Sequence, residues 1–266
     1  MVEVEGLKTK RKDDSEIGHP LITVITVCRN SKKTIRQTIE SVLRQNYINI
    51  EYIVLDGHST DGTLEILKDY KKAHPDKFYF VSESDSGLYY AMNKGIDMAN
   101  GKLIGIINSD DVYSNQAISD VVSAWLEYGR PDLVLGSTAI MDDACLVARG
   151  IAKPTIMKDK FYVQIPHPSS FVRKSAYLKY GKFDTNFRYA ADRDLMLRLI
   201  HANATFKILD SVLAYFRQGG LGSRIGITAQ IENFRIDKTY LGFITACYNF
   251  GFNYLYSIYK KISNNL

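Results

Sequence analysis

Two adjacent carboxylates follow an apolar run in this chain and are the residues best placed to do chemistry. Residues 103–107 are mostly apolar, and Asp110 and Asp111 follow shortly afterwards. This pattern is typical of a buried strand that ends at the carboxyl edge of an open sheet, where ligands of α/β proteins bind. Two neighbouring carboxylates repel each other, and Mg²⁺ or Mn²⁺ with oxygen ligands offsets that repulsion. The alternative is a polar loop in which Asp111 caps the next helix.

A third acid, Asp56, ends another apolar segment and is predicted to lie at the same edge. Parallel strands bring their carboxyl ends to one rim, so Asp56, Asp110 and Asp111 can share one crevice. The Gly-x-Gly-x-x-Gly turn of dinucleotide-binding folds is missing after the first apolar segment, where residues 29–31 read Arg-Asn-Ser. The crevice is therefore predicted to hold a nucleotide through its base, its ribose and a metal-bridged diphosphate. Asp56 as a turn residue before Gly57 is the alternative.

Two further acids, Asp192 and Asp194, start a predicted helix in the second half of the chain. On a helix they stand about 200° apart and cannot both face one pocket. Asp194 precedes Arg198 by four residues, the spacing of a helical salt bridge, and is assigned to structure. Asp192 lies at the helix start, where its carboxylate points off the helix end and is free to act. Simple capping of the helix is the alternative for Asp192.

His167 and Arg217 are further candidates, for contacts with the acceptor or the diphosphate. Prolines on both sides of His167 stiffen the backbone and could hold its side chain as a hydrogen-bond donor. A surface loop histidine is the alternative. Arg217 precedes a glycine-rich stretch that could close over a diphosphate as a lid, and an ordinary flexible loop is the alternative there.

The elements that would position these residues alternate between strands and helices. Apolar runs predict strands at 21–28, 51–56, 78–83, 103–107 and 133–136. Helical spacing and turn residues predict helices near 35–43, 59–70, 87–99, 114–128, 173–180 and 192–202. This alternation predicts an α/β fold with a mostly parallel sheet flanked by helices. After residue 136 the pattern loosens, and we expect a hairpin tip at 141–144 and a loop region at 150–168.

The composition limits the class of protein and its surroundings. The chain has 266 residues, is 45% hydrophobic and carries a net charge of +5. This mild positive charge suits phosphates or acidic headgroups and does not indicate nucleic acid. The three cysteines have no metal-site spacing and indicate a reducing compartment. Residues 1–20 lack the apolar core of a secretory signal and are predicted to be a flexible arm, so a cytoplasmic location is expected.

Taken together, several segments resemble the family 2 glycosyltransferases, which have the GT-A fold. The similarity lies in residues 22–30, 52–63 (YIVLDGHSTDGT), 86–101 (SGLYYAMNKGIDMANG), 108–111 and 183–198. It covers about residues 20–225. It implies a domain at 21–225, with a nucleotide-binding half at 21–113 and an acceptor and catalytic half at 114–225, followed by an aromatic helical tail at 226–266.

The resemblance implies an inverting transfer from a nucleotide-diphosphate sugar, with UDP favoured, to a hydroxyl of a glycan or a lipid-linked acceptor in surface polysaccharide synthesis. The implied cofactor is Mg²⁺ or Mn²⁺. By this resemblance, Val27, Arg29 and Asp56 would contact the base and ribose. Asp110 would contact the ribose or the metal, and Asp111 would ligate the metal. Asp192 would be the general base.

The chain also departs from the family pattern. Many members carry an acid where Gly57 stands and an arginine where Met92 stands, and Lys94 is predicted to supply the missing cation. Members usually have an aromatic residue where Arg29 stands. Asp85 either faces the nucleotide or merely opens the following helix.

Residues 241–266 combine many aromatic residues with Lys260 and Lys261. This composition suits the inner face of the cytoplasmic membrane; packing on the domain or a homodimer contact is the alternative. Two other functions stay open at this point. One is a nucleotidyltransferase acting on a sugar phosphate, although the glycine-rich loop of that class is missing. The other is a non-catalytic module that binds a nucleotide or glycan.

Overall fold

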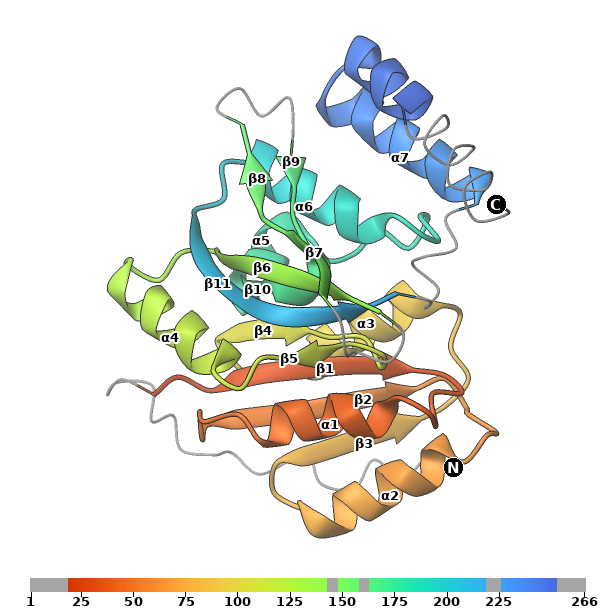
Figure 1. Cartoon of the computed structure of the whole chain (residues 1–266), viewed down its shortest axis with the longest axis vertical. Helices are drawn as coiled ribbons and strands as arrows, with labels where there is room; N and C mark the ends of the chain where they lie inside the picture. The colour runs from red at the N-terminus through yellow and green to blue at the C-terminus, as the bar shows by residue number, and fades with distance from the viewer. Residues whose placement is uncertain (1–18, 143–147, 158–162, 219–225, 253–266) are drawn as a thin grey trace.

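The computed structural model describes residues 19–142, 148–157, 163–218 and 226–252. The N-terminal half alternates strictly between strands and helices (Figure 1). Its elements are β1 (Ile22–Cys28), α1 (Ile35–Leu43), β2 (Ile50–Asp56), α2 (Thr63–Ala73), β3 (Phe78–Ser82), α3 (Leu88–Met98) and β4 (Leu103–Ile106). All four strands are parallel, in the order β3-β2-β1-β4, which confirms the predicted strand positions and direction.

The second half extends this sheet with strands of both directions. Its elements are β5 (Val112–Tyr113), α4 (Ala117–Glu127), β6 (Leu133–Met141), β7 (Ala148–Ala152), β8 (Thr155–Ile156), β9 (Val163–Gln164), the 3₁₀ turn η1 (His167–Ser169), β10 (Ser170–Arg173), α5 (Lys174–Tyr180), α6 (Ala191–His201), β11 (Phe206–Arg217) and α7 (Ile227–Tyr240). The nine-stranded sheet continues β4-β10-β6-β11-β5, with β7 beside β6. The predicted α/β fold is confirmed, and its sheet is mixed beyond β4 because β10, β5 and β7 pair antiparallel.

One expectation for the second half needs correction. The sequence predicts a loop region at 150–168, yet this segment contains most of β7, all of β8 and β9, and the start of η1. These strands are short and mostly exposed, so they carry little of the alternation that marks a strand in sequence. The predicted hairpin is present between β6 and β7, while residues 143 and 144 of its predicted tip at 141–144 lie outside the described residues.

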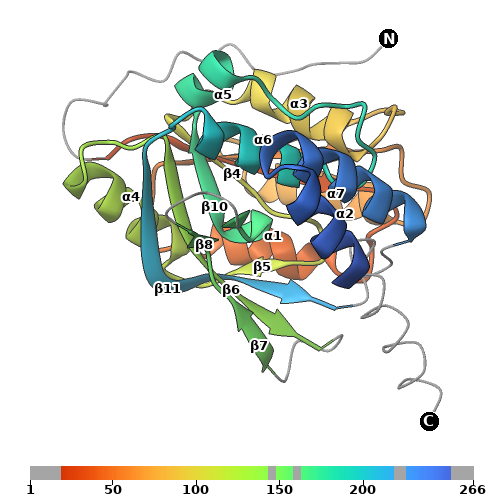
Figure 2. The ribbon, with the colours of Figure 1, turned by 90° about the horizontal axis from the view of Figure 1, so that it is seen from above.

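Helices cover both faces of the sheet (Figure 2). One core cluster joins α1, α2 and α4 to one face, and a second joins α3, α5 and α6 to the other. In β1 alternate residues enter the two clusters, Val24 the first and Ile25 the second. Because β1 is buried on both faces, its sequence is almost continuously apolar rather than alternating.

The C-terminal helix α7 packs against α6. Ile236 of α7 joins Leu197 and Ile200 of α6 in a small third cluster, and Figures 1 and 2 both show α7 beside α6. A further helical stretch covers residues 243–252. Within the described part of the chain, no helix is long and apolar enough to cross a bilayer.

Candidate functional site

Asp56 lies at the carboxyl end of β2 and is almost completely buried. Its carboxylate accepts hydrogen bonds from the Ser59 backbone N–H at 3.1 Å, from Ser82 Oγ at 2.6 Å and from the Ser59 hydroxyl. Cys28 Sγ, at the end of β1, lies 3.6 Å from it. Asp56 therefore organises the turn that follows β2, as the alternative suggested, and it also borders a pocket at the sheet edge.

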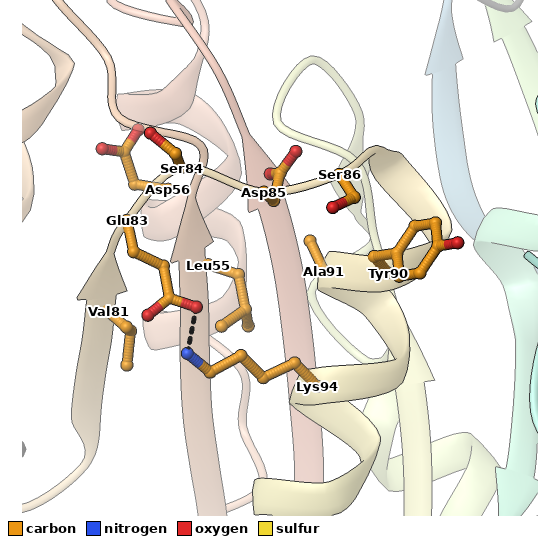
Figure 3. Close-up of a pocket in the computed structure, with 10 residues that line it drawn as sticks. All are labelled: Leu55, Asp56, Val81, Glu83, Ser84, Asp85, Ser86, Tyr90, Ala91 and Lys94. Carbon is orange, nitrogen blue, oxygen red and sulfur yellow. Dashed lines mark hydrogen bonds and ion pairs between the residues drawn. The ribbon is translucent and has the colours of Figure 1, made fainter.

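This pocket has a volume of about 220 Å³ and lies between the end of β2 and α3 (Figure 3). Lys94 of α3 reaches across it to form an ion pair with Glu83. Met92, the residue at the family's cationic position, is buried in the core. Lys94 is thus the cation that α3 contributes to the pocket lining, and Glu83 offsets its charge.

Asp85 lines the same pocket, supports the start of α3 and lies next to Gly57. It accepts a hydrogen bond from the Gly87 N–H at 3.0 Å, which supports the start of α3. Its Oδ2 would lie 2.8 Å from a Cβ placed on Gly57, and the Arg29 side chain would lie 3.4 Å from that Cβ. The missing side chain at Gly57 therefore leaves room for Asp85 and Arg29, which explains one departure from the family pattern. Val27, the remaining base-contact candidate, is buried near the end of β1.

Asp110 and Asp111 follow β4, and Asp111 is fully buried. Burial, followed by the neighbouring charge of Asp110, raises the pKa of Asp111 to about 8. Burial also raises the pKa of Asp110. Asp111 Oδ1 accepts the Arg217 backbone N–H at 3.0 Å, and Oδ2 lies 3.4 Å from Asn108 Nδ2. Buried carboxylates with raised pKa values are frequent at functional sites, because a bound cation or substrate can compensate their charge.

The chemistry of this corner fits a divalent cation. Asn108 Oδ1 is buried without a hydrogen-bond partner among the described residues, close to the carboxylate of Asp111. An orphaned amide oxygen and two adjacent carboxylates are the hard oxygen donors that Mg²⁺ and Mn²⁺ prefer. Within the described ranges, no three His, Cys, Asp or Glu side chains gather as a metal cage. A cation here would therefore need ligands from the diphosphate as well, as Mg²⁺ at phosphate sites commonly does.

Arg217 ends β11, a strand that is not evident in the sequence. Its Nε donates to the Asp110 carbonyl oxygen at 3.2 Å, and its guanidinium also donates to the side chain of Gln37. The backbone N–H of Arg217 donates to Asp111, so Arg217 connects the end of β11 to the segment that carries Asp110 and Asp111. The predicted glycine-rich lid falls mainly on residues 219–225, which lie outside the described residues.

Asp192 lies in the first turn of α6 and is half-buried. Its Oδ1 accepts hydrogen bonds from the Tyr89 hydroxyl at 3.1 Å and from the Arg193 N–H at 2.9 Å. Tyr89 belongs to the first turn of α3, so Asp192 lies beside the helix that borders the nucleotide-side pocket. The predicted salt bridge of Asp194 is confirmed, with Arg198 at 2.9 Å.

His167 faces the same region from η1. Both of its ring nitrogens are buried and have no hydrogen-bond partner in the part of the chain that the structure describes. Its ring packs edge-on against Phe183, with centroids 6.0 Å apart. Burial lowers the pKa of His167, and the charge of Asp192 opposes that shift. The imidazole is therefore shielded from solvent and lies within the electrostatic reach of Asp192.

Glu232 holds the turn before Asp192, a role that no sequence pattern indicates. The buried Glu232 carboxylate accepts backbone N–H groups at 3.0, 2.8 and 3.1 Å, from Arg188, Tyr189 and Ala190. Asp237, further along α7, pairs with Arg193 at 2.6 Å. Neither acid is near this turn in sequence, so only the folded arrangement reveals them.

Comparisons with known proteins identify the family to which this sequence is similar. The family model described as "Glycosyl transferase family 2" matches residues 23–162. An uncharacterized glycosyltransferase of Mycobacterium tuberculosis is 32% identical over 211 residues, which cover 77% of this chain and 78% of that protein. A candidate teichuronic acid biosynthesis glycosyltransferase of Bacillus subtilis, TuaG, is 33% identical over 108 residues, which cover 41% of this chain and 43% of that protein.

A solved structure supports the same fold. The crystal structure of S. aureus TarS 1-349 in complex with UDP-GlcNAc aligns with a TM-score of 0.64 at 18% sequence identity. The alignment covers 81% of this chain and 65% of that one, so this chain spans slightly less than two thirds of the TarS fragment.

Proposed function

Because the chain belongs to the family 2 glycosyltransferases, we propose that it transfers a sugar from a UDP-sugar to a hydroxyl of a glycan or lipid-linked acceptor, with inversion at the sugar carbon. The observation that carries this proposal is the placement of acids from distant segments along the carboxyl edge of the parallel sheet. Asp56 ends β2 and Asp111 follows β4, the two strands that flank β1. Asp192 contacts Tyr89 at the start of α3, the helix that borders the pocket at this edge.

The nucleotide fits the side of the site formed by β1, β2 and α3. We assign the base and ribose to the region of Val27, Arg29 and Asp56, next to the pocket lined by Asp85 and Lys94. UDP is favoured by the TarS complex, whose ligand is UDP-GlcNAc. The TuaG name refers to teichuronic acid, a polysaccharide, and supports a glycan acceptor.

A divalent cation would be held by Asp111, with Asp110 and Asn108 Oδ1 beside it. When bound, such an ion neutralises the negative charge that develops on the departing nucleoside diphosphate. The residues themselves prepare this site. Arg217 fixes the carboxylate of Asp111 through its backbone N–H, and the burial of that carboxylate makes a compensating positive charge favourable.

The acceptor side is assigned to Asp192, Tyr89 and His167. The Asp192 carboxylate removes the proton of the acceptor hydroxyl, whose oxygen forms the new bond to the sugar carbon. The bond from that carbon to the diphosphate oxygen breaks, and its electron pair leaves with the diphosphate. Tyr89 holds the other side of the carboxylate by donating to Oδ1. The orphaned nitrogens of His167 suit a hydroxyl of the acceptor.

A panel of nucleotide sugars tests this function even when no acceptor is supplied. The protein is incubated with each sugar and Mn²⁺, and the released products are separated by ion-exchange chromatography. A sugar transferase with water as a slow acceptor releases a nucleoside diphosphate, and EDTA stops the release. If a nucleoside triphosphate and a sugar phosphate instead yield pyrophosphate, the protein is a nucleotidyltransferase.

Replacing Glu232 by glutamine is expected to reduce kcat by about tenfold or more and to leave the KM for the donor unchanged. Hydrogen bonds to a charged acceptor contribute about 1.5–3 kcal/mol, and an amide cannot accept all three backbone N–H groups. The loosened turn misplaces Asp192 without touching the nucleotide side. Steady-state kinetics checks the result, and Glu127→Gln on the exposed end of α4 is the control. An unchanged kcat, or a loss confined to the KM for the donor, contradicts a positioning role.

A further inference from the structure

We propose that the helical stretch 243–252 docks on the surface of an anionic phospholipid bilayer through one apolar face. This docking goes beyond sugar transfer and does not depend on it. The face, here called the C-terminal apolar face, consists of Ile244, Tyr248 and Phe252. Their exposed fractions are 84%, 72% and 61%.

The opposite face of the stretch is fastened to the protein, so the direction of the C-terminal apolar face is fixed. Ala246 is fully buried, and Asn249 Nδ2 donates to Asp237 at 2.8 Å. Phe250 packs edge-on against Phe234 of α7, with ring centroids 5.7 Å apart. Because Ile244, Tyr248 and Phe252 recur every four residues, they lie along one side of the helix. The contacts of the opposite side with α7 therefore keep this apolar strip exposed to solvent.

The distribution of charge along the sequence identifies the partner. Residues 239–259 contain no Asp, Glu, Lys or Arg, and this run is bracketed by Lys238 and by Lys260 and Lys261. Lys238 and Arg235 are both exposed at the end of α7. Interfacial helices have this composition, because apolar and aromatic side chains enter the headgroup boundary while lysines meet anionic lipids.

The aromatic residues favour a bilayer surface over a second copy of the chain. The uncharged run contains Tyr248, Tyr254, Tyr256 and Tyr259, and amphipathic rings of this kind concentrate at membrane interfaces. A stable protein interface needs about 800 Å² and about 20–30 residues from each partner. A strip of three exposed side chains is far smaller, whereas a bilayer requires no complementary shape.

Docking at this face would also place the catalytic side of the enzyme near the membrane. The same α7 helix that supports residues 243–252 contacts the turn before Asp192 through Glu232 and contacts Arg193 through Asp237. A docked chain would therefore hold its acceptor side close to substrates anchored in the bilayer.

Vesicle flotation with the full chain tests the proposal. The wild type is expected to float with vesicles of phosphatidylglycerol and phosphatidylcholine, and raising the salt concentration should weaken this binding. The double variant Ile244→Glu/Tyr248→Glu is expected to bind vesicles at least roughly tenfold more weakly, because two side chains that would be buried in the bilayer interface are replaced by charged ones. Leu178→Glu, at a position on α5 with an exposed fraction of 81%, is the matched control and should float like the wild type.

Folding is checked by the melting temperature and by nucleoside diphosphate binding, both of which should match the wild type in the double variant. Equal flotation of the double variant and the wild type overturns the proposal, as does a wild type that ignores anionic vesicles. A concentration-dependent dimer in analytical ultracentrifugation that the double variant abolishes, without vesicle binding, would assign the face to a second copy instead. Since flotation needs no sugar donor, these results are independent of whether the proposed transfer is correct.

Discussion

Replacing Asp111 by asparagine is expected to reduce sugar transfer by about 10²–10³-fold, the usual cost of removing a group that stabilises developing charge. The same change is expected to make the protein more stable at alkaline pH. Asparagine keeps an oxygen for the Arg217 N–H. Its new amide replaces Oδ2, which faces Asn108 Nδ2 at 3.4 Å. When the Asn108 amide turns over, the new amide donates to Asn108 Oδ1, which has no partner among the described residues of the wild type. The substitution thus removes a buried charge and satisfies an orphaned acceptor.

The effect on stability depends on pH in a defined direction. Burial raises the pKa of Asp111 from 3.8 to about 8 in the folded protein, so the folded state holds this proton more tightly than the unfolded state. The stability that comes from protonation is complete below about pH 4 and is lost as the pH rises through 8. Asparagine has no proton to lose. The advantage of the variant should therefore grow between pH 4 and pH 8 and stay constant above that range.

Thermal unfolding in EDTA at pH 5 and pH 8.5 checks this prediction. At pH 8.5 the melting temperature of Asp111→Asn should exceed that of the wild type by at least about 2 °C, since 1 kcal/mol shifts the midpoint by about 2–4 °C in a domain of this size. Asp69→Asn, at an exposed position of α2, should show no such difference. A variant that is less stable than the wild type at pH 8.5 would show that the Asp111 charge is already compensated inside the protein.

Replacing Asp192 by asparagine is expected to lower kcat by on the order of 10²–10⁴-fold, the usual contribution of a general base. The amide keeps an oxygen for the Tyr89 hydroxyl and the Arg193 N–H, so the turn should stay in place. Binding of nucleoside diphosphate should not change, because the nucleotide side of the site is untouched. Isothermal titration calorimetry and steady-state kinetics separate the two effects.

Asp194→Asn is a control from the same helix with the opposite expected outcome. Asp194 pairs with Arg198 and accepts a hydrogen bond from Tyr240 at 3.2 Å, so its loss leaves a partly buried cation without its partner. The melting temperature should fall by several degrees, as the size dependence of unfolding predicts, while kcat stays within a small factor of the wild type. If Asp194→Asn is the more damaging change for kcat, the assignment of the two acids is reversed.

The sequence alone predicts the strands, helices and ion pairs whose residues follow a local spacing pattern. The strands β1 and β2 are short, apolar and rich in β-branched residues, and their burial on both faces makes that signal strong. The pairing of Asp194 with Arg198 follows from helical spacing alone. Asp56 and Asp111 can be assigned to one edge because parallel strands align their carboxyl ends.

What the sequence does not reveal depends on contacts between distant segments. β10 and β11 are inserted beside strands that are far away in the chain, so no local turn signals their pairing. The roles of Arg217 and Glu232 arise from groups that they meet only in the fold. These partners lie 106 residues away for the Arg217 N–H on Asp111 and 42 residues away for Glu232 on the Ala190 N–H. A charged residue looks the same in sequence whether it meets solvent or a backbone N–H.

The proposed mechanism is a single displacement, in which Asp192 activates a hydroxyl on the face of the sugar opposite the leaving diphosphate. The most direct measurement is the anomeric configuration of the first product, followed by proton NMR from the start of the reaction with whichever nucleotide sugar the protein uses. We expect the configuration to be inverted relative to the donor and Asp192→Asn to abolish this product. A product that keeps the donor configuration would contradict the single displacement and the role of Asp192 with it.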